Sequence, residues 1–236
     1  MATIFVSDTS GDDGNSGASQ AEAKKTITAA RNVASDGDTI EIIDEATYNE
    51  FDINLRENFT IIHTASELGR PTINGGSSGF NGSRRIFIGN GTGGNGITLS
   101  GLHLTNANFL IFNSTDNLEG LTIQDCFVND IQNISRFNMS GSSGDGKINF
   151  NQSSFFFLGS NAFVGSVNVN GYAEITNCFF SKSNAAPYDF YKQAILRSPD
   201  SSPNVTASFS TFIYRNGASS EPVIQDWAKV INCIVT

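Results

Sequence analysis

Six segments of the chain read alike, and this internal repeat restricts the possible folds more than any other feature. The clearest copies are residues 122–128 around Cys126, 174–180 around Cys178 and 229–235 around Cys233. Weaker copies are residues 98–104, 149–155 and 208–214. Equivalent apolar residues are Leu99, Ile123, Phe150, Ile175, Phe209 and Val230. They recur about every 25 residues, and the spacing from Ile175 to Phe209 is the longest.

Each copy has the pattern of a short strand that ends at a corner. Two or three residues alternate between apolar and polar, as in a half-buried strand. The next position holds Gly101, Asp125, Gln152, Asn177, Thr211 or Asn232. Gly, Asn and Asp tolerate a left-handed backbone, so we expect the chain to turn there. The following position, Leu102, Cys126, Ser153, Cys178, Phe212 or Cys233, is expected to point inward, where cysteine acts as a small apolar residue.

The length of the repeat selects a fold class. It is too short for a propeller blade, it lacks the helical pattern of ankyrin or tetratricopeptide repeats, and it lacks the leucine ladder of leucine-rich repeats. A parallel β-solenoid fits the pattern. The expected core stack contains Ile123, Cys126, Ile175, Cys178, Val230 and Cys233.

The first part of the chain differs from the repeat and is expected to cap the solenoid. Residues 19–22 form a capping-box sequence, and apolar residues follow at helical spacing until Gly37. We predict one domain over residues 1–236, with a cap at 1–58 that holds a helix at about 20–35. Repeat coils follow at 59–236, with an inserted loop at about 184–204.

Several of these segments carry a resemblance to a known superfamily. Residues 6–8 with the Gly/Asp/Asn/Ser-rich loop after them, 25–27, 37–40 and 48–50, together with the Ile-x-Asn-Cys-x-Phe element, resemble right-handed parallel β-helix proteins of the pectate-lyase-like superfamily. The resemblance implies an all-β, right-handed, single-stranded parallel β-helix with a short N-terminal capping helix. It leaves function open, because the superfamily includes polysaccharide lyases, glycoside hydrolases, epimerases, adhesins and phage tailspikes.

Catalytic groups of a β-helix enzyme are expected at the outward strand positions, on the same face of adjacent turns. A glycoside hydrolase needs two carboxylates roughly 5 to 10 Å apart, and a lyase needs a base beside acidic calcium ligands. Among the outward positions only Glu174 and Lys229 are ionisable, and they do not lie on consecutive turns. We therefore predict no catalytic residue, cofactor or metal site, with Glu174 as the fallback catalytic candidate if the protein is an enzyme.

Composition excludes several other classes. Asn (26), Ser (28) and Gly (23) are abundant, but 19 Phe give the chain enough to bury. A net charge of −9 argues against nucleic-acid binding. No apolar run is long enough to span a membrane, and the N-terminus lacks the pattern of a signal peptide. The three cysteines lack disulfide or zinc-site spacing.

Two features point to a partner. Residues 188–191 place three aromatics in the inserted loop, so Tyr188, Phe190 and Tyr191, with Trp227, are candidate contacts for another subunit or a glycan; packing against their own solenoid is the alternative. The sequence stops within or just after a repeat strand, and an open solenoid end normally needs a cover.

These points lead to a functional expectation. We expect a non-enzymatic virion protein of a phage, a capsid-decorating (cement) protein or a short fibre or spike. It would form a homo-oligomer, for which the resemblance to phage β-helix proteins implies a trimer, on a capsid or tail at the virion surface. The alternative is an extracellular β-helix protein that binds or degrades polysaccharide.

Overall fold

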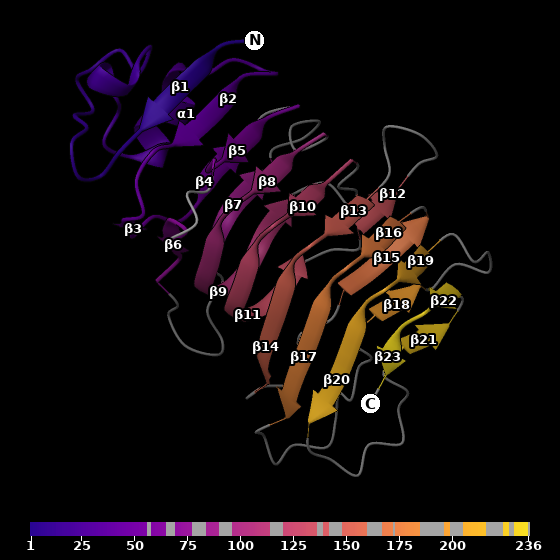
Figure 1. Cartoon of the computed structure of the whole chain (residues 1–236). Coiled ribbons are helices and arrows are strands. Elements are labelled where there is room, and N and C mark those ends of the chain that lie inside the picture. Colours follow the sequence, from indigo (N-terminus) through magenta and orange to yellow (C-terminus); the bar gives the residue numbers. More distant parts are fainter. Residues whose placement is uncertain are drawn as a thin grey trace.

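The computed structural model of the chain is built mainly from short parallel strands (Figure 1). It describes residues 1–55, 58–64, 69–76, 84–89, 96–113, 120–135, 139–141, 148–159, 167–171, 173–184, 196–198, 205–215, 224–226 and 229–235. No helix in this part of the chain is long and apolar enough to cross a membrane.

The strands that precede each corner of the repeat form a parallel sheet of nine described strands. In sheet order they are β1 (Thr3–Val6), β2 (Thr39–Ile42), β5 (Thr60–Ile62), β8 (Thr98–Ser100), β10 (Thr122–Gln124), β13 (Ile148–Asn151), β16 (Ala173–Thr176), β19 (Val205–Ser208) and β22 (Lys229–Ile231). This order is also their order along the chain, so each new strand joins the edge left by the one before.

A second parallel sheet takes up the strands that follow each corner. Its main path is β3 (Thr47–Tyr48), β6 (Thr72–Asn74), β9 (His103–Asn113), β11 (Phe127–Ser135), β14 (Ser154–Gly159), β17 (Phe179–Asn184), β20 (Thr211–Arg215) and β23 (Ile234–Val235). β4 (Ile53–Leu55) pairs with β7 (Arg85–Gly89), which also pairs with β9. From β8 onward the described strands pass from the nine-stranded sheet to this one at every repeat.

A third sheet was not expected from the sequence. It contains β12 (Met139–Gly141), β15 (Val167–Gly171), β18 (Leu196–Ser198) and β21 (Ile224–Asp226), all in parallel pairs. The predicted inserted loop at about 184–204 therefore contains a strand, β18, in register with neighbours on both sides. The all-β, parallel character expected from the repeat is confirmed at this level.

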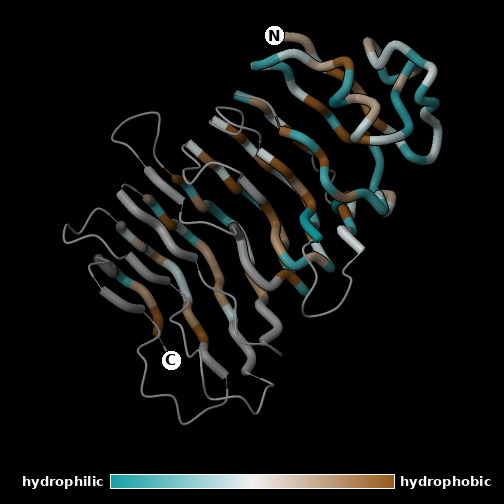
Figure 2. The backbone as a smooth tube through the Cα atoms, turned by 180° about the vertical axis from the view of Figure 1, so that it is seen from behind, coloured by the Kyte–Doolittle hydropathy of each residue, from teal (hydrophilic) through white to brown (hydrophobic). Residues whose placement is uncertain are grey.

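The core lies behind the nine-stranded sheet, where one or two residues of each strand from β1 to β19 are buried. Residues in register along one row are Ile4, Ile40, Ile61, Leu99, Ile123, Phe150, Ile175 and Ala207, all buried. Phe155, Phe180 and Phe212 stack behind the second sheet, with ring centroids 4.6 and 5.0 Å apart. Figure 2 shows hydrophobic and hydrophilic residues alternating along the described strands.

The corners follow the predicted pattern, with one correction. Gly101, Asp125, Gln152, Asn177 and Asn232 have positive φ, as does Phe209 at +49°. Because Ala207 pairs with Ile175, the copy at 208–214 was aligned two residues too far along the chain. The predicted corner at Thr211 is wrong, since Thr211 lies within β20, and Phe209 is 63% exposed, whereas the alignment had placed it in the core.

Leu102 follows the corner at Gly101, and the position after the later corners alternates between cysteine and serine: Cys126, Ser153, Cys178, Ser210 and Cys233. Each cysteine or serine side chain donates a hydrogen bond to the carbonyl two residues earlier, as Ser153 Oγ does to Asn151 at 2.8 Å. Ser153 Oγ also accepts from the Cys126 N–H at 3.1 Å. The slot therefore pairs backbone groups at the corner, and Phe212, predicted for it, lies in the aromatic stack instead.

The N-terminal unit is less helical than predicted. The helix expected at about 20–35 is split into a 3-10 turn, η1 (Gln20–Glu22), and α1 (Ile27–Val33). Between them the chain is extended, and Lys24 exchanges backbone hydrogen bonds with Phe5 and Ser7 next to β1. Thr26 caps α1, accepting from the N–H of Ala29.

Candidate functional site

The outward face of the nine-stranded sheet carries two straight rows of polar side chains. Residues on adjacent strands lie in register, so one row contains Thr98, Thr122, Asn149, Glu174 and Thr206. The second row contains Ser100, Gln124, Asn151, Thr176 and Ser208. Parallel strands lie about 4.8 Å apart, so each row repeats at that interval.

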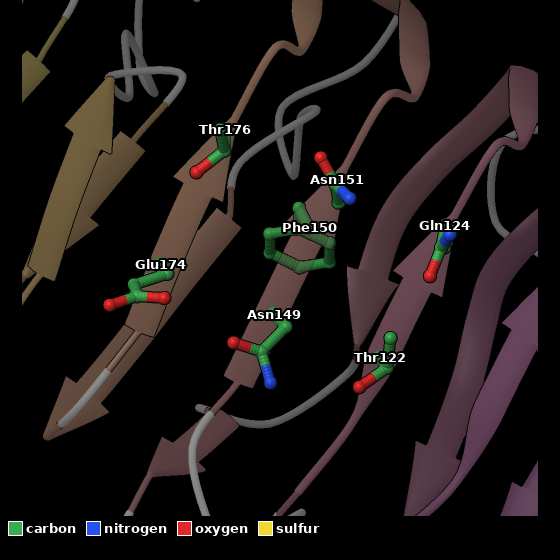
Figure 3. Close-up of a pocket in the computed structure, with 7 residues that line it drawn as sticks. All are labelled: Thr122, Gln124, Asn149, Phe150, Asn151, Glu174 and Thr176. Carbon is green, nitrogen blue, oxygen red and sulfur yellow. The ribbon is translucent and has the colours of Figure 1, made fainter.

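An open pocket of about 340 Å³ lies in the middle of this face. Its described lining residues come from β10, β13 and β16 (Figure 3): Thr122, Gln124, Asn149, Phe150, Asn151, Glu174 and Thr176. Phe150 is 1% exposed, so its ring belongs to the core. The other lining residues present hydroxyl, amide and carboxylate groups to the pocket, and all of these groups can form hydrogen bonds with a ligand.

Glu174 is the only ionisable residue among the described residues that line the pocket. Its side chain is exposed on β16, with Asn149 and Thr206 in register on either side. Lys229 follows Thr206 in the same row, on β22, and its side chain lies outside the described residues. A single exposed carboxylate among amides and hydroxyls can donate or accept a proton at a bound ligand.

Two other described carboxylates near this sheet are placed differently. Glu41, on β2, lies five strands from Glu174, which puts the two backbones about 24 Å apart at the usual strand spacing. Asp125, at the corner after β10, forms an ion pair with Arg70. Its backbone carbonyl also accepts from Arg70 Nε at 3.1 Å. These contacts indicate that Asp125 stabilises the corner after β10.

Two cysteines of the core stack, Cys126 and Cys178, are buried and poorly suited to act as nucleophiles. Burial raises the pKa of the Cys126 thiol to about 12, and burial also raises the pKa of Cys178, to about 11. Both thiols therefore stay protonated near neutral pH, and the thiolate is the reactive form. In the part of the chain that the structure describes, no three His, Cys, Asp or Glu residues are grouped so as to hold a metal ion.

A separate polar cluster lies on the outer side of the second sheet. His103 is placed between Thr72 and Asn129, with its Nδ1 3.1 Å from Thr72 Oγ1 and its Nε2 2.7 Å from Asn129 Oδ1. The imidazole also contacts the ring of Phe127, at a centroid distance of 5.0 Å. Both ring nitrogens have partners, so this cluster ties three neighbouring strands together.

Most residues of the predicted core stack lie together in the structure, whereas the predicted contact residues lie outside the described part of the chain. Of the expected core stack, Ile123, Cys126, Ile175 and Cys178 are buried, and Cys233 is partly buried against the core. Val230 pairs with Ala207, and its side chain lies outside the described residues. The candidate contacts Tyr188, Phe190, Tyr191 and Trp227 also lie outside them.

The sequence pattern placed the described lining residues other than Phe150 on the outward face, but it did not identify a pocket. The alternation of apolar and polar residues gives the side of the sheet on which Asn149 or Glu174 lies. Whether a pocket forms also depends on the lengths of the side chains that lie next to one another on three adjacent strands. Only the aligned register of β10, β13 and β16 shows which of them meet.

Comparison with known proteins gives a likeness of fold. No protein-family model matches the sequence, and no match was found among the curated proteins. A selenomethionine-derivative crystal structure of GH136 lacto-N-biosidase from Eubacterium ramulus aligns with a TM-score of 0.51 and 11% identity, covering 98% of this chain and 57% of that one. The native structure of that enzyme aligns with a TM-score of 0.37 and 13% identity, covering 90% of this chain and 44% of that one.

The comparison corrects the functional expectation drawn from the sequence. A fold of the parallel β-helix type is supported, and the phage or virion link gains no support. The expectation of a non-enzymatic structural protein is wrong, because a solved structure with a similar fold is a glycoside hydrolase. The chain spans 57% of that enzyme chain.

Proposed function

We propose that this chain is a carbohydrate-active protein of the glycoside-hydrolase type, with its substrate bound on the outward face of β10, β13 and β16. The observation that carries the proposal is Glu174, an exposed carboxylate that shares an open pocket with hydroxyl and amide side chains among the described lining residues. The fold likeness to a glycoside hydrolase supports the same class of function.

We also propose the finer description of the fold, a right-handed single-stranded solenoid. Consecutive strands of the nine-stranded sheet are parallel neighbours joined through a strand of the second sheet, as β8 and β10 are through β9. Crossover connections between parallel strands of one sheet are right-handed in nearly all proteins. A crystal structure of the chain tests the handedness.

Glu174 would act as general acid. Its carboxyl group would donate a proton to the glycosidic oxygen as the bond to the anomeric carbon breaks, so that the leaving sugar departs as a neutral alcohol. A water molecule would then form the new bond to the anomeric carbon and give its proton to the Glu174 carboxylate, which restores the acid. Asn149, in register with Glu174, and Thr176, on the same strand, would hold the sugar hydroxyls on either side. Most glycosidases use a second carboxylate, and the described lining residues do not include one.

The test compares two glutamates on the same face. Wild-type protein is incubated with a panel of neutral and acidic polysaccharides and oligosaccharides, and new reducing ends are measured. Glu174→Gln is expected to lower the rate by about 10²-fold or more, because general acid–base groups contribute on that scale. Glu41→Gln is the matched control, because Glu41 faces the same way five strands away. An unchanged rate in the folded Glu174→Gln variant would overturn the assignment.

A further inference from the structure

The charge of the outward face restricts the kind of glycan that the proposed site can accept. Ten outward positions on β8, β10, β13, β16 and β19 consist of hydroxyl or amide residues and one carboxylate, Glu174. None of these ten described residues is basic. Lys229 lies one strand beyond them.

A charged glycan would need different chemistry. Carboxylate and sulfate groups on sugars are bound by arginine and lysine, through charge-assisted hydrogen bonds. Glu174 would repel such groups, and the net charge of −9 would oppose their approach over a longer range. Hydroxyl and amide side chains both donate and accept hydrogen bonds, as sugar hydroxyls do.

The spacing of the two rows of polar side chains indicates how a glycan would lie on the outward face. The pocket residues repeat at the strand spacing of about 4.8 Å, which is close to the length of one pyranose residue in an extended glycan. The two rows are two residues apart along each strand, or about 7 Å, which leaves a strip between them about as wide as a sugar ring. A glycan that crosses the strands meets an equivalent pair of polar groups at each step.

From these observations we propose that the substrate is a neutral, linear glycan that lies across the strands with one sugar residue per strand. This inference rests on the proposed function. Sugars would lie over β10, β13 and β16, with Glu174 beside the bond that is cleaved, and Thr206 and Ser208 on β19 would contact the next sugar. Because the face lacks an aromatic platform among these ten residues, binding would be shared over several sugars.

The experiment measures binding by calorimetry, with wild-type protein and with Glu174→Gln to prevent turnover. The probes are neutral oligosaccharides of two to six residues from the cello-, xylo- and manno- series, with oligogalacturonates and heparin fragments of matched length as acidic probes. We expect at least one neutral series to bind about tenfold or more tightly than the acidic probes. Its affinity should rise with each added sugar up to about four, the number of strands that offer a polar pair from β10 to β19.

Single substitutions then test which residues of the outward face contact the glycan. Asn149→Ala and Asn151→Ala should each weaken binding of the longer neutral glycan by about two- to tenfold, the usual effect of one lost hydrogen bond. Thr39→Ala, in the Glu174 row but on β2, is the matched control and should leave binding unchanged. Asn151→Lys should introduce measurable binding of oligogalacturonate.

The outcomes separate this inference from the proposed function. If the wild-type protein binds or cleaves the acidic probes in preference to the neutral ones, the inference is overturned and the carbohydrate-active assignment stands. Affinity that does not increase with the length of the glycan overturns the proposed alignment. If no probe of either charge binds and no reducing ends appear, the proposed function itself fails, and the inference fails with it.

Discussion

Phe209 has a backbone conformation that suits its side chain poorly. At the equivalent corners the chain places Gly101, Asn177 and Asn232, residues that reach positive φ at low cost. A bulky residue in this region is unusual and costs about 1–2 kcal/mol. Phe209 is in addition 63% exposed, so its ring gains little from burial.

Replacing this phenylalanine should therefore stabilise the protein. Phe209→Asn is expected to raise the free energy of unfolding by about 1 kcal/mol, because asparagine tolerates the left-handed backbone. Chemical denaturation of both proteins, with the slopes compared, measures the difference. Asn232→Ala, at the next corner, is the reciprocal variant and should lower stability. A lower stability of Phe209→Asn would mean that the exposed ring has a stabilising role.

The cysteine and serine side chains after each corner show why these two residue types alternate in one slot. Both are small, and both donate to the carbonyl two residues earlier. Their equivalence is therefore one of size and hydrogen bonding. The corner carbonyls also accept from backbone N–H groups, but the N–H groups of Cys126 and Cys178 donate to Ser153 Oγ and Ser210 Oγ. An apolar residue in place of either serine would remove that acceptor, at a cost of about 1–3 kcal/mol for each buried N–H group left unpaired. From the sequence alone the cysteines had been interpreted as small apolar residues, which accounts for the burial but not for the serines.

At the scale of elements, the repeat strands could be predicted and the rest of the fold could not. Alternation and corner residues reveal strands such as β10 and β16, because their inward and outward positions differ sharply in polarity. The third sheet was missed because β12, β18 and β21 are each three residues long, and because the alternating residues of β15, Val-Asn-Val-Asn-Gly, stand alone without a similar copy in the other three strands. The repeat copy at 208–214 was misaligned because phenylalanine is typical of core positions, so Phe209 was assigned to the core. The split of the predicted helix follows from the pairing of Lys24 with β1, a tertiary contact.

The N-terminal unit is held by a carboxylate whose protonation should weaken it. Burial alone would raise the pKa of Asp44, but hydrogen bonds from Tyr48, Thr9 and Ser7 outweigh it and hold that pKa below its ordinary value. The hydroxyl of Tyr48 donates to Asp44 at 2.7 Å, and that of Ser7 does so at 2.8 Å. A depressed pKa contributes stability that is present above the pKa of the unfolded chain and is lost as pH falls through the folded-state value.

Asp44→Asn should therefore change the acid sensitivity of the protein. Because an unfolded aspartate titrates near pH 4, the wild type should exceed Asp44→Asn in stability most clearly above about pH 5. The difference should shrink as pH falls below about 4. Urea denaturation at several pH values measures it. Tyr48→Phe removes one of the hydrogen bonds that depress the pKa, so its stability should depend less steeply on pH than that of the wild type. A difference between wild type and Asp44→Asn that does not vary with pH would contradict this account.

Across the whole molecule, strand pairing in the described sheets links each strand to its immediate neighbours. In the nine-stranded sheet β16 pairs with β13 and β19, and β2 pairs with β1 and β5. Such nearest-neighbour architecture makes stability approximately a sum of local terms. The candidate site has the same property, because three adjacent strands supply all of its described lining residues. Its outward residues could be predicted from the sequence, whereas the pocket depended on the register between strands.

Double-mutant cycles should show this locality directly. Phe155→Leu and Phe180→Leu alter rings that stack at 4.6 Å, so their effects on the free energy of unfolding should be non-additive by about 1 kcal/mol. Ile40→Val lies on β2, far along the stack from Phe180, so Ile40→Val and Phe180→Leu should add within about 0.5 kcal/mol. Denaturation of the single and double variants gives both coupling energies. A coupling between Ile40 and Phe180 as large as that between the two phenylalanines would show that strain passes along the whole stack. Substitutions in the N-terminal unit could then alter the pocket around Glu174, whereas local coupling leaves the pocket unchanged.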